Sequence, residues 1–249
     1  MKVVTSPQQM AQKAIHLLQK SSNKKTAQQS KKYFKPHEEI YFYGVSAPEL
    51  RELTRALYAE VKNEWSITEA MQFCGKLITS RYLEAKALGI FLLARFHQSF
   101  EKSLFEKAKS WLRKNHCANW AATDALCMYV IGPLLNAYPS LAPNLLKWSR
   151  SKNLWVRRAS ASSLVSLARQ GEHLDLAYQI AEQLFPDKED LIHKATGWLL
   201  REAGKTDPTR LQSFLLKHGL SIPRTTLRYA IERFAQGKRK TILNKTKAS

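Results

Sequence analysis

The segment YLEAKALGIFLL (residues 82–93) places a small residue among apolar residues at three- and four-residue spacing, and the same pattern returns in LWVRRASASSL (154–164) and IHKATGWLL (192–200). The equivalent small residues, 72 and 36 positions apart, are Ala87, Ala159 and Ala195. Thr123 occupies the remaining position of a 36-residue period. A period of this length suits two antiparallel helices per repeat, as in HEAT-like solenoids, because small residues let successive helices stack closely.

Helical spacing of apolar residues extends over almost the whole chain. Only nine Gly and nine Pro interrupt 249 residues, and no run alternates as a strand does. The sequence therefore predicts an all-α protein, a right-handed α-solenoid of antiparallel helix pairs. Chance similarity within an Ala-rich helical bundle is the alternative. Polar caps and first-turn prolines predict helices that begin near Ser6, Lys25, Pro48, Thr68, Tyr82, Phe100, Asn119, Ser140, Leu154, Glu172, Asp190, Pro208 and Pro223.

The repeat also predicts a basic surface. One position before each shared small residue stand Lys86, Ala122, Arg158 and Lys194. If the repeated helices line the concave side of a solenoid, the three cations line a basic groove. Asp124 stands one position after the small residue of its own repeat, so an acid would lie beside these cations. Solvated helix surface is the alternative explanation for the lysines.

The chain is strongly basic, with 40 Lys and Arg against 20 Asp and Glu and a formal net charge of +20. Such an excess indicates a polyanionic partner, of which nucleic acid is the first candidate. Only a quarter of the net charge comes from the last residues, Lys238, Arg239, Lys240, Lys245 and Lys247. We expect one domain at residues 1–236, followed by a basic, disordered tail at 237–249 that either holds DNA or only adds solubility.

Several classes of protein are not expected. No segment approaches 18 uninterrupted apolar residues and the N-terminus lacks an apolar signal core, so the expectation is a cytoplasmic protein without membrane association. Cys74, Cys117 and Cys127 form no CxxC pair, and their odd number argues against a disulfide framework. The seven histidines show no metal-ligand spacing. The sequence predicts neither a metal nor a cofactor.

Asp124 is the only charged residue between positions 117 and 146, where the chain's 24% average would give about seven. A buried, unpaired carboxylate costs several kcal/mol, so a structural ion pair and a catalytic or binding role are both open. Trp120 lies one helical turn earlier, on the same face. Trp198 stands four residues after Lys194 on another repeated helix. Core packing is the alternative role for both tryptophans.

Three segments, in order, resemble the AlkD family of bacterial DNA alkylation repair glycosylases: NWAATD (119–124), NLWVRRA (153–159) and HKATGWLLREAGKTDP (193–208). The stretch YFKPHEEIYFYGVSAPELREL (33–53) is similar to the N-terminal region of that family. The resemblance extends from about Tyr33 to Phe234. It implies a HEAT-like repeat enzyme that hydrolyses the N-glycosidic bond of cationic alkylated purines in duplex DNA, without flipping the base into a pocket.

The resemblance also implies roles for individual residues. Asp124 matches the catalytic aspartate, and Trp120 and Trp198 match two tryptophans that flank the deoxyribose of the lesion. Arg158 matches an arginine that contacts the DNA backbone, and Tyr33 matches a tyrosine near the lesion. Further DNA contacts are expected from Lys86, Lys194 and Arg201. The family often has an acid where this chain has Ala121, which leaves the preferred lesion open.

The implied chemistry agrees with the residue types. In 3-methyladenine and 7-methylguanine the base is already cationic and leaves as a neutral molecule. Positive charge then develops on the sugar, where a carboxylate stabilises it and positions water. We expect a monomeric, monofunctional glycosylase whose partner is damaged double-stranded DNA, including DNA with bulky adducts, and which needs no protein partner. A non-catalytic HEAT-like DNA or RNA binder and a protein-binding scaffold are the alternatives.

Overall fold

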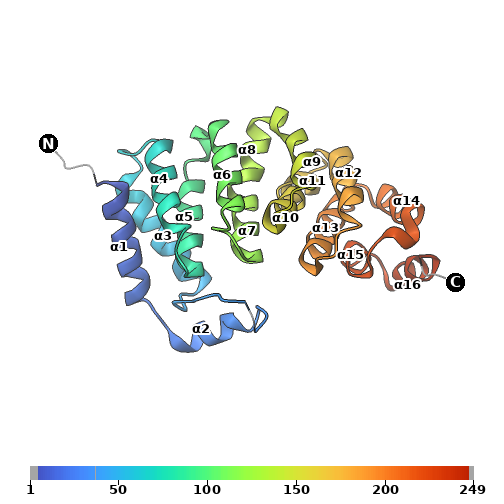
Figure 1. Cartoon of the computed structure of the whole chain (residues 1–249), viewed down its shortest axis with the longest axis horizontal. Helices are drawn as coiled ribbons and strands as arrows, with labels where there is room; N and C mark the ends of the chain where they lie inside the picture. Colours follow the sequence, from blue (N-terminus) through green and yellow to red (C-terminus); the bar gives the residue numbers. More distant parts are fainter. Residues whose placement is uncertain (1–4, 37, 247–249) are drawn as a thin grey trace. The chain divides into compact units, whose positions relative to one another are not determined.

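The structure is a computed structural model that describes residues 5–36 and 38–246 (Figure 1). Within these ranges the chain is helical, with no β-strand and one isolated bridge, between Tyr41 and Tyr82. The prediction of an all-α protein is therefore confirmed. The chain divides into two compact units, Met1–Leu134 and Leu135–Ser249, and the single domain at residues 1–236 stays a prediction. We call them the first and the second unit.

The first unit contains seven α-helices and begins the eighth. They are α1 (Pro7–Lys20), α2 (Lys24–Lys31), α3 (Ala47–Val61), α4 (Ile67–Leu77), α5 (Leu83–Ala94), α6 (Ser103–Arg113), α7 (Trp120–Leu126) and α8 (Gly132–Ala137), which contains the boundary. A short 3₁₀ turn, η1 (His97–Ser99), follows α5. A π-helical turn, η2 (Cys127–Ile131), joins α7 to α8. The whole stretch from α7 to α8 is thus one helical segment with a widened turn in its middle.

The second unit continues with helices α9 to α16. They are α9 (Leu145–Trp148), α10 (Leu154–Ser162), α11 (Val165–Arg169), α12 (Leu174–Leu184), α13 (Asp190–Ala203), α14 (Pro208–His218), α15 (Arg224–Ala230) and α16 (Gln236–Lys245). Two 3₁₀ segments, η3 (Pro139–Asn144) and η4 (Gly219–Ser221), connect them. The helix starts agree with the sequence prediction to within a few residues, with two exceptions. The start predicted near Ser140 is that of the 3₁₀ segment η3, and α8, α9, α11 and α16 were not predicted separately.

Side-chain caps explain why the starts were predictable. Ser6 and Ser66 open α1 and α4 with capping boxes, in which each serine and the residue three positions later hydrogen-bond reciprocally. Asn119 caps α7, because its Oδ1 accepts a hydrogen bond of 2.8 Å from the backbone of Ala122. Asn153 caps α10 in the same way. These polar residues satisfy backbone amides that a helix leaves without internal partners.

The 36-residue period corresponds to one helix of each repeat. Ala87, Thr123, Ala159 and Ala195 lie on α5, α7, α10 and α13. In the first unit α5 packs against α4 and α7, and in the second unit α13 packs against α10, α12 and α15. All of these small residues except Ala87 are fully buried. The repeat of packed helices is thus confirmed within each unit, whereas the right-handed sense and the concave groove stay predictions.

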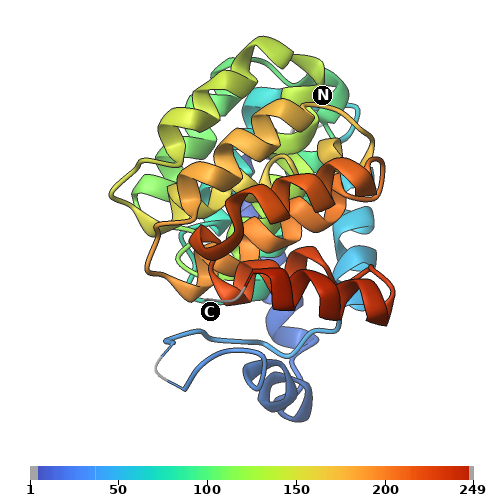
Figure 2. The ribbon, with the colours of Figure 1, turned by 90° about the vertical axis from the view of Figure 1, so that its right-hand side faces the viewer.

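The C-terminal segment differs from the disordered tail that was expected. Residues 236–245 form α16, which packs against α14 (Figure 2). Ile242 is fully buried, and Thr246 is buried with its hydroxyl donating to the Ile242 carbonyl at 2.7 Å. The composition predicted disorder because this helix buries a single large apolar residue, and that is too little to give a recognisable pattern. Lys247 lies outside the described residues.

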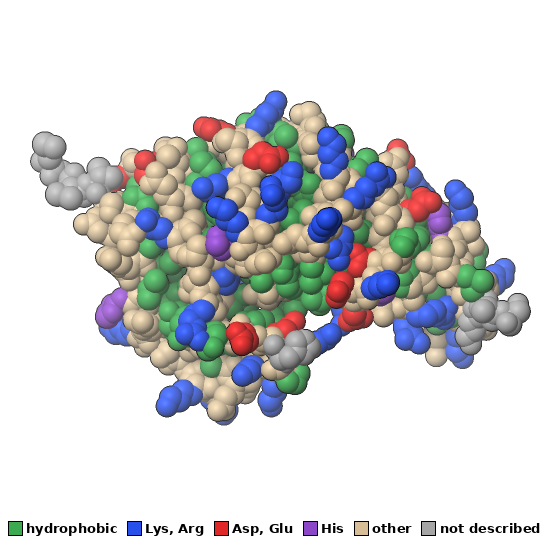
Figure 3. All heavy atoms as spheres, in the orientation of Figure 1, with side chains coloured by type: hydrophobic (Ala, Val, Ile, Leu, Met, Phe, Trp, Pro, Cys, Tyr) green, Lys and Arg blue, Asp and Glu red, His purple; other side chains and the backbone are tan. Residues whose placement is uncertain are grey.

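Positive charge is spread over both units. The first unit has 20 Lys and Arg against 11 Asp and Glu, and the second has 20 against 9. Lys and Arg side chains cover much of the face drawn in Figure 3. Neither unit alone therefore accounts for the basic character of the chain.

None of the helices in the described part of the chain is both long and apolar enough to span a bilayer.

Candidate nucleic-acid site

Asp124 lies in the middle of α7 and is partly buried. Trp120 is the first residue of the same helix, four positions earlier, and it is also partly buried. Residues four apart on an α-helix share a face, so the indole and the carboxylate are neighbours on one side of α7. The cap by Asn119 fixes where this helix begins and hence the direction of both side chains.

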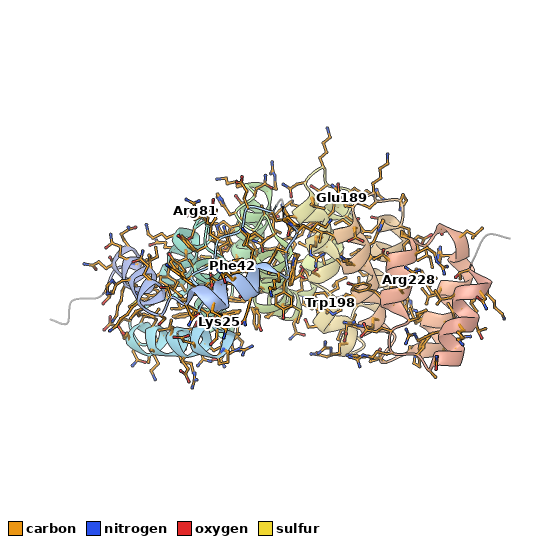
Figure 4. The ribbon with its side chains drawn as sticks, turned by 90° about the horizontal axis from the view of Figure 1, so that it is seen from below. Lys25, Phe42, Arg81, Glu189, Trp198 and Arg228 are labelled. Carbon is orange, nitrogen blue, oxygen red and sulfur yellow. The ribbon has the colours of Figure 1, made fainter. Side chains whose placement is uncertain are left out.

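Trp120 belongs to an aromatic cluster that the sequence did not predict. The ring of Phe34 stacks on the indole, with ring centres 5.1 Å apart and planes at 21°. Phe42, labelled in Figure 4, contacts Phe34 at a centre distance of 5.6 Å. The chain after α2 therefore passes beside the N-terminal end of α7 and covers one face of the Trp120 ring.

Glu84 holds this segment in place. It lies buried in the first turn of α5, and its two oxygens accept hydrogen bonds from the backbone amides of Gly44 and Tyr43, at 2.8 and 3.1 Å. Gly44 has φ +83°, and a Cβ there would lie 2.0 Å from the Asn23 carbonyl oxygen. Only glycine fits, because the conformation is left-handed and the neighbouring backbone is too close for a side chain.

Tyr33 also lies in this segment, and its contact with DNA stays a prediction. Its side chain is exposed (78%), whereas the next residue, Phe34, is the ring that contacts Trp120. The sequence signal for Phe34 was the aromatic run at positions 33–43, whose members could not be told apart without the fold. The first unit therefore brings together Asp124, Trp120 and Phe34.

Lys86 is not available in the way that the repeat predicted. It is buried on α5, and its Nζ donates hydrogen bonds to the carbonyl oxygens of Ile78 and His116, at 2.7 and 2.6 Å. Burial lowers the pKa of Lys86, while the neighbouring Cys117 opposes this change. The carbonyl groups of two turns thus already bind the ammonium group of Lys86, which argues against the DNA contact expected from its register.

Arg158, the equivalent residue of α10, has a comparable environment. It is buried, and its Nη1 donates to the carbonyl oxygen of Leu191 at the start of α13. Its neighbour Arg157 pairs with Asp187 through Nε and Oδ2, 2.6 Å apart. Both arginines therefore connect α10 to the region around the next repeat. A contact between Arg158 and DNA stays a prediction.

Lys194 and Trp198 lie on α13, four residues apart. The Lys194 side chain is 38% exposed and pairs with Asp190 at 2.8 Å, one turn earlier. The hydrogen bond that Lys194 donates to Asp190 raises the pKa of Lys194. Trp198, labelled in Figure 4, is partly buried. Of the three cations in the predicted series, Lys194 is the one that keeps a substantially exposed side chain.

Arg201 takes part in a cluster of charges on the same helix. Its side chain is 18% exposed and binds both Glu202, at 3.2 Å, and Glu232. Glu202 is buried and also accepts from Arg169 and Lys205, at 2.7 and 2.6 Å. Burial alone would raise the pKa of Glu202, but hydrogen bonds from Lys205 and Arg169 lower it overall. The predicted DNA contact of Arg201 would compete with these pairs.

Metal ligation has no candidate site among residues 5–36 and 38–246. No three His, Cys, Asp or Glu side chains come close enough there to hold an ion. The three cysteines are buried thiols, and burial raises the pKa of Cys117 to about 12. Burial also raises the pKa of Cys74 well above its ordinary value, so Cys74 and Cys117 are protonated at neutral pH.

Comparisons with known proteins relate the whole chain to DNA repair. A solved structure described as "Predicted DNA alkylation repair enzyme from Enterococcus faecalis" matches with a TM-score of 0.76 and 22% sequence identity, covering 87% of this chain and 98% of that one. At this identity the match shows a shared fold. A search of curated protein sequences gave no significant match.

The family assignment comes from the sequence itself. The family model described as "DNA alkylation repair enzyme" matches residues 14–234, which include most of both units and every residue of the candidate site. This agrees with the resemblance found in the segments around Asp124, Arg158 and Trp198. The chain belongs to the DNA alkylation repair enzyme family.

Proposed function

We propose that the protein is a monofunctional DNA N-glycosylase that releases cationic alkylated purines, such as 3-methyladenine and 7-methylguanine, from duplex DNA. One observation supports this most directly. In a member of the DNA alkylation repair family, a partly exposed carboxylate, Asp124, shares a helix face with the aromatic ring of Trp120. A protein that only binds DNA has no need for a carboxylate there, because the backbone of DNA is negative.

The proposed reaction begins with departure of the base. The bond between C1′ of the deoxyribose and the purine nitrogen breaks, and its electron pair neutralises the cationic base. The sugar becomes positively charged. Asp124 stabilises this charge and accepts a proton from the water that attacks C1′, so that the products are free base and an abasic site. Positioned groups of this kind contribute about 10²- to 10⁴-fold to rate.

The aromatic residues would act on the same positive charge. An aromatic face attracts a nearby cation by about 0.5–2 kcal/mol. Phe34 covers one face of Trp120, so the sugar would meet the indole from its other side or edge. Trp198 is the second aromatic residue that the family resemblance assigns to the deoxyribose of the lesion. No pocket for a flipped base is needed, because the charge on the lesion already makes it leave.

Contacts to the DNA backbone would come from the exposed cations. Lys194 is the first candidate because it is partly exposed and protonated at neutral pH. Arg158 and Tyr33 are further candidates through the family resemblance. Selectivity would arise from the lability of the lesion, and bulky adducts would be accepted. We also propose that the protein acts as a monomer in the cytoplasm.

The decisive experiment measures base release. Methylated duplex DNA is incubated with the purified chain, and free 3-methyladenine and 7-methylguanine are quantified by chromatography. Asp124→Asn should lower the release rate at least about 100-fold with little change in DNA affinity. Asp175→Asn is the matched control, since Asp175 is an exposed aspartate on α12 whose carboxylate pairs with Arg210. If neither the parent chain nor the control releases methylated bases, the protein is a non-catalytic DNA binder instead.

A second experiment tests the backbone contacts. DNA affinity is measured at several salt concentrations, and Lys194→Ala should reduce the slope of log affinity against log salt by about one. Lys86→Met is the control, because its ammonium group is buried and bound to two carbonyl oxygens. An unchanged slope in Lys194→Ala would remove this lysine from the phosphate contacts.

A further inference from the structure

The first unit contains a cavity that has no role in the function proposed above. It has a volume of about 770 Å³, within the range of small-molecule sites, and lies among α3, α5, η1 and the π-helical turn η2. Its lining contains three arginines, Arg51, Arg55 and Arg95, and no acidic residue. Anions are therefore the charged ligands that this cavity would favour.

The cavity also has an aromatic wall. Phe91 on α5 and Tyr129 on η2 both line it, and their rings meet edge to face with centres 4.9 Å apart. Tyr129 is 43% exposed, which is unusual for a large aromatic side chain. It belongs to a π-helical turn, a widened turn that often occurs at functional sites. The aromatic ring is thus presented to solvent by an irregular piece of backbone.

The arginines surround this wall from two helices. Arg51 and Arg55 are four residues apart on α3 and share a face of that helix. Arg55 pairs with Glu52 at 3.8 Å, but both side chains are more than 60% exposed, so the pair is weak. Arg95 ends α5, and its guanidinium lies 5.0 Å from the ring centre of Tyr58. All three can turn toward an anion in the cavity.

We propose that this cavity binds a nucleotidyl group, with its phosphate on the arginines and its base against Tyr129 and Phe91. Arginine binds phosphate through paired hydrogen bonds, and bases stack on exposed aromatic side chains. A simple anion would not need the exposed ring, and an apolar ligand would not need three arginines. The proposal does not depend on catalysis by Asp124. A free nucleotide and an unpaired nucleotide of a DNA strand offer this same chemistry.

Calorimetric titration of the full chain tests the site. The probes are 2′-deoxyadenosine 5′-monophosphate, a short oligo-deoxyadenylate single strand, and inorganic phosphate. Tyr129→Ala and Arg95→Ala should each weaken binding of the nucleotide about tenfold. Tyr129→Phe should bind like the parent chain, because it keeps the ring. Arg233→Ala, which removes an exposed arginine from the second unit, is the matched control and should change nothing.

Each outcome decides between explanations. Much tighter binding of the single strand, lost in Tyr129→Ala, identifies an unpaired nucleotide as the ligand, whereas equal affinities per nucleotide identify a free nucleotide. The proposal is overturned if inorganic phosphate binds as tightly as the nucleotide, or if Tyr129→Ala and Arg95→Ala bind both probes like the parent chain. Circular dichroism confirms that each variant is folded, which Tyr129 and Arg95 allow because both are exposed.

Discussion

The two units connect their elements in different ways. In the second unit, arginines on one repeat pair with acids about one repeat further along, as in Arg157 with Asp187 and Arg169 with Glu202. In the first unit, the segment after α2 is held by stacked rings. Backbone carbonyl oxygens bind Lys86 there and also bind Arg158, its equivalent in the second unit. Several cations of both units are therefore already bound within the fold.

The number of Lys and Arg residues in a unit is therefore different from the number whose side chains are free to contact DNA. Each unit has 20 Lys and Arg, yet several of these join one repeat to the next. A net charge indicates a polyanionic partner without identifying the residues that meet it. The cations left for DNA are those with exposed side chains, such as Lys194. The following predictions test how far the two units differ.

The largest effect should come from glycines at helix contacts. A Cβ on Gly197 would lie 2.4 Å from the Tyr229 Cβ and 2.7 Å from the Thr226 carbonyl oxygen, so α13 and α15 would have to separate. We expect Gly197→Ala to lower the free energy of unfolding by about 3 kcal/mol.

Gly89→Ala on α5 is the counterpart in the first unit. Its Cβ would meet the Leu77 Cβ at 3.0 Å, and the gain in helix propensity would offset part of this strain. We expect the free energy of unfolding of this variant to differ from that of the parent chain by no more than about 1 kcal/mol. Chemical denaturation measures both variants, and equal losses would contradict a closer helix contact in the second unit.

Lys86→Met should lower the free energy of unfolding by about 2 kcal/mol, because the carbonyl oxygens of Ile78 and His116 would lose their donor. Lys107→Met on α6 removes the same charge from an exposed position and should change stability by less than about 0.5 kcal/mol. Urea denaturation compares the two variants. If both behaved alike, the bonds made by Lys86 would contribute nothing to stability.

Glu202→Gln should cost about 1.5 kcal/mol at pH 7, because it weakens hydrogen bonds from Arg169 and Lys205. The pKa of Glu202 is lower in the folded chain than its ordinary value of 4.5. Its contribution is therefore present above that ordinary value and is lost as the pH falls through the lowered pKa. Thermal unfolding from pH 7 to pH 3 should show the two proteins converging in acid. A constant difference would exclude ionised Glu202 as the cause.

The smallest effect should come from Phe34→Leu. The variant keeps an apolar side chain but removes the stacking on Trp120, which is worth about 1 kcal/mol. Hydrogen exchange should speed up for the backbone amides around position 34 and stay unchanged in α13. Exchange that stayed slow near position 34 would mean that Glu84 alone holds the segment.

The fold could be predicted to a large extent from the sequence. Apolar spacing and caps such as Asn119 and Asn153 are local signals, and the 36-residue period exposed the repeat. The helix α16 was missed because burial of Ile242 depends on α14, which is a tertiary contact. The boundary between the two units lies inside α8, so no loop composition marks it in the sequence.

The site was predictable only in part. Asp124 and Trp120 stood out because one is a lone charge and the other lies a turn away on the same helix. The register predicted accessible cations at Lys86 and Arg158. The carbonyl groups that bind them belong to turns after α4 and α6 and to the first turn of α13, and these tertiary contacts are not encoded in the helical pattern of α5 or α10. The sequence could not show that Phe34, and not Tyr33, contacts Trp120 on α7. Which of the two rings faces α7 and which faces solvent depends on the path of a segment that has no regular secondary structure.

The bonds that Glu84 makes have a mechanical consequence. Its carboxylate belongs to the first turn of α5, while its partners, the amides of Tyr43 and Gly44, lie on the segment that carries Phe34 and Phe42. Any displacement of that end of α5 is thus transmitted to the ring resting on Trp120. If a bound duplex displaced the first turn of α5, the position of the Trp120 indole on α7 would therefore change as well.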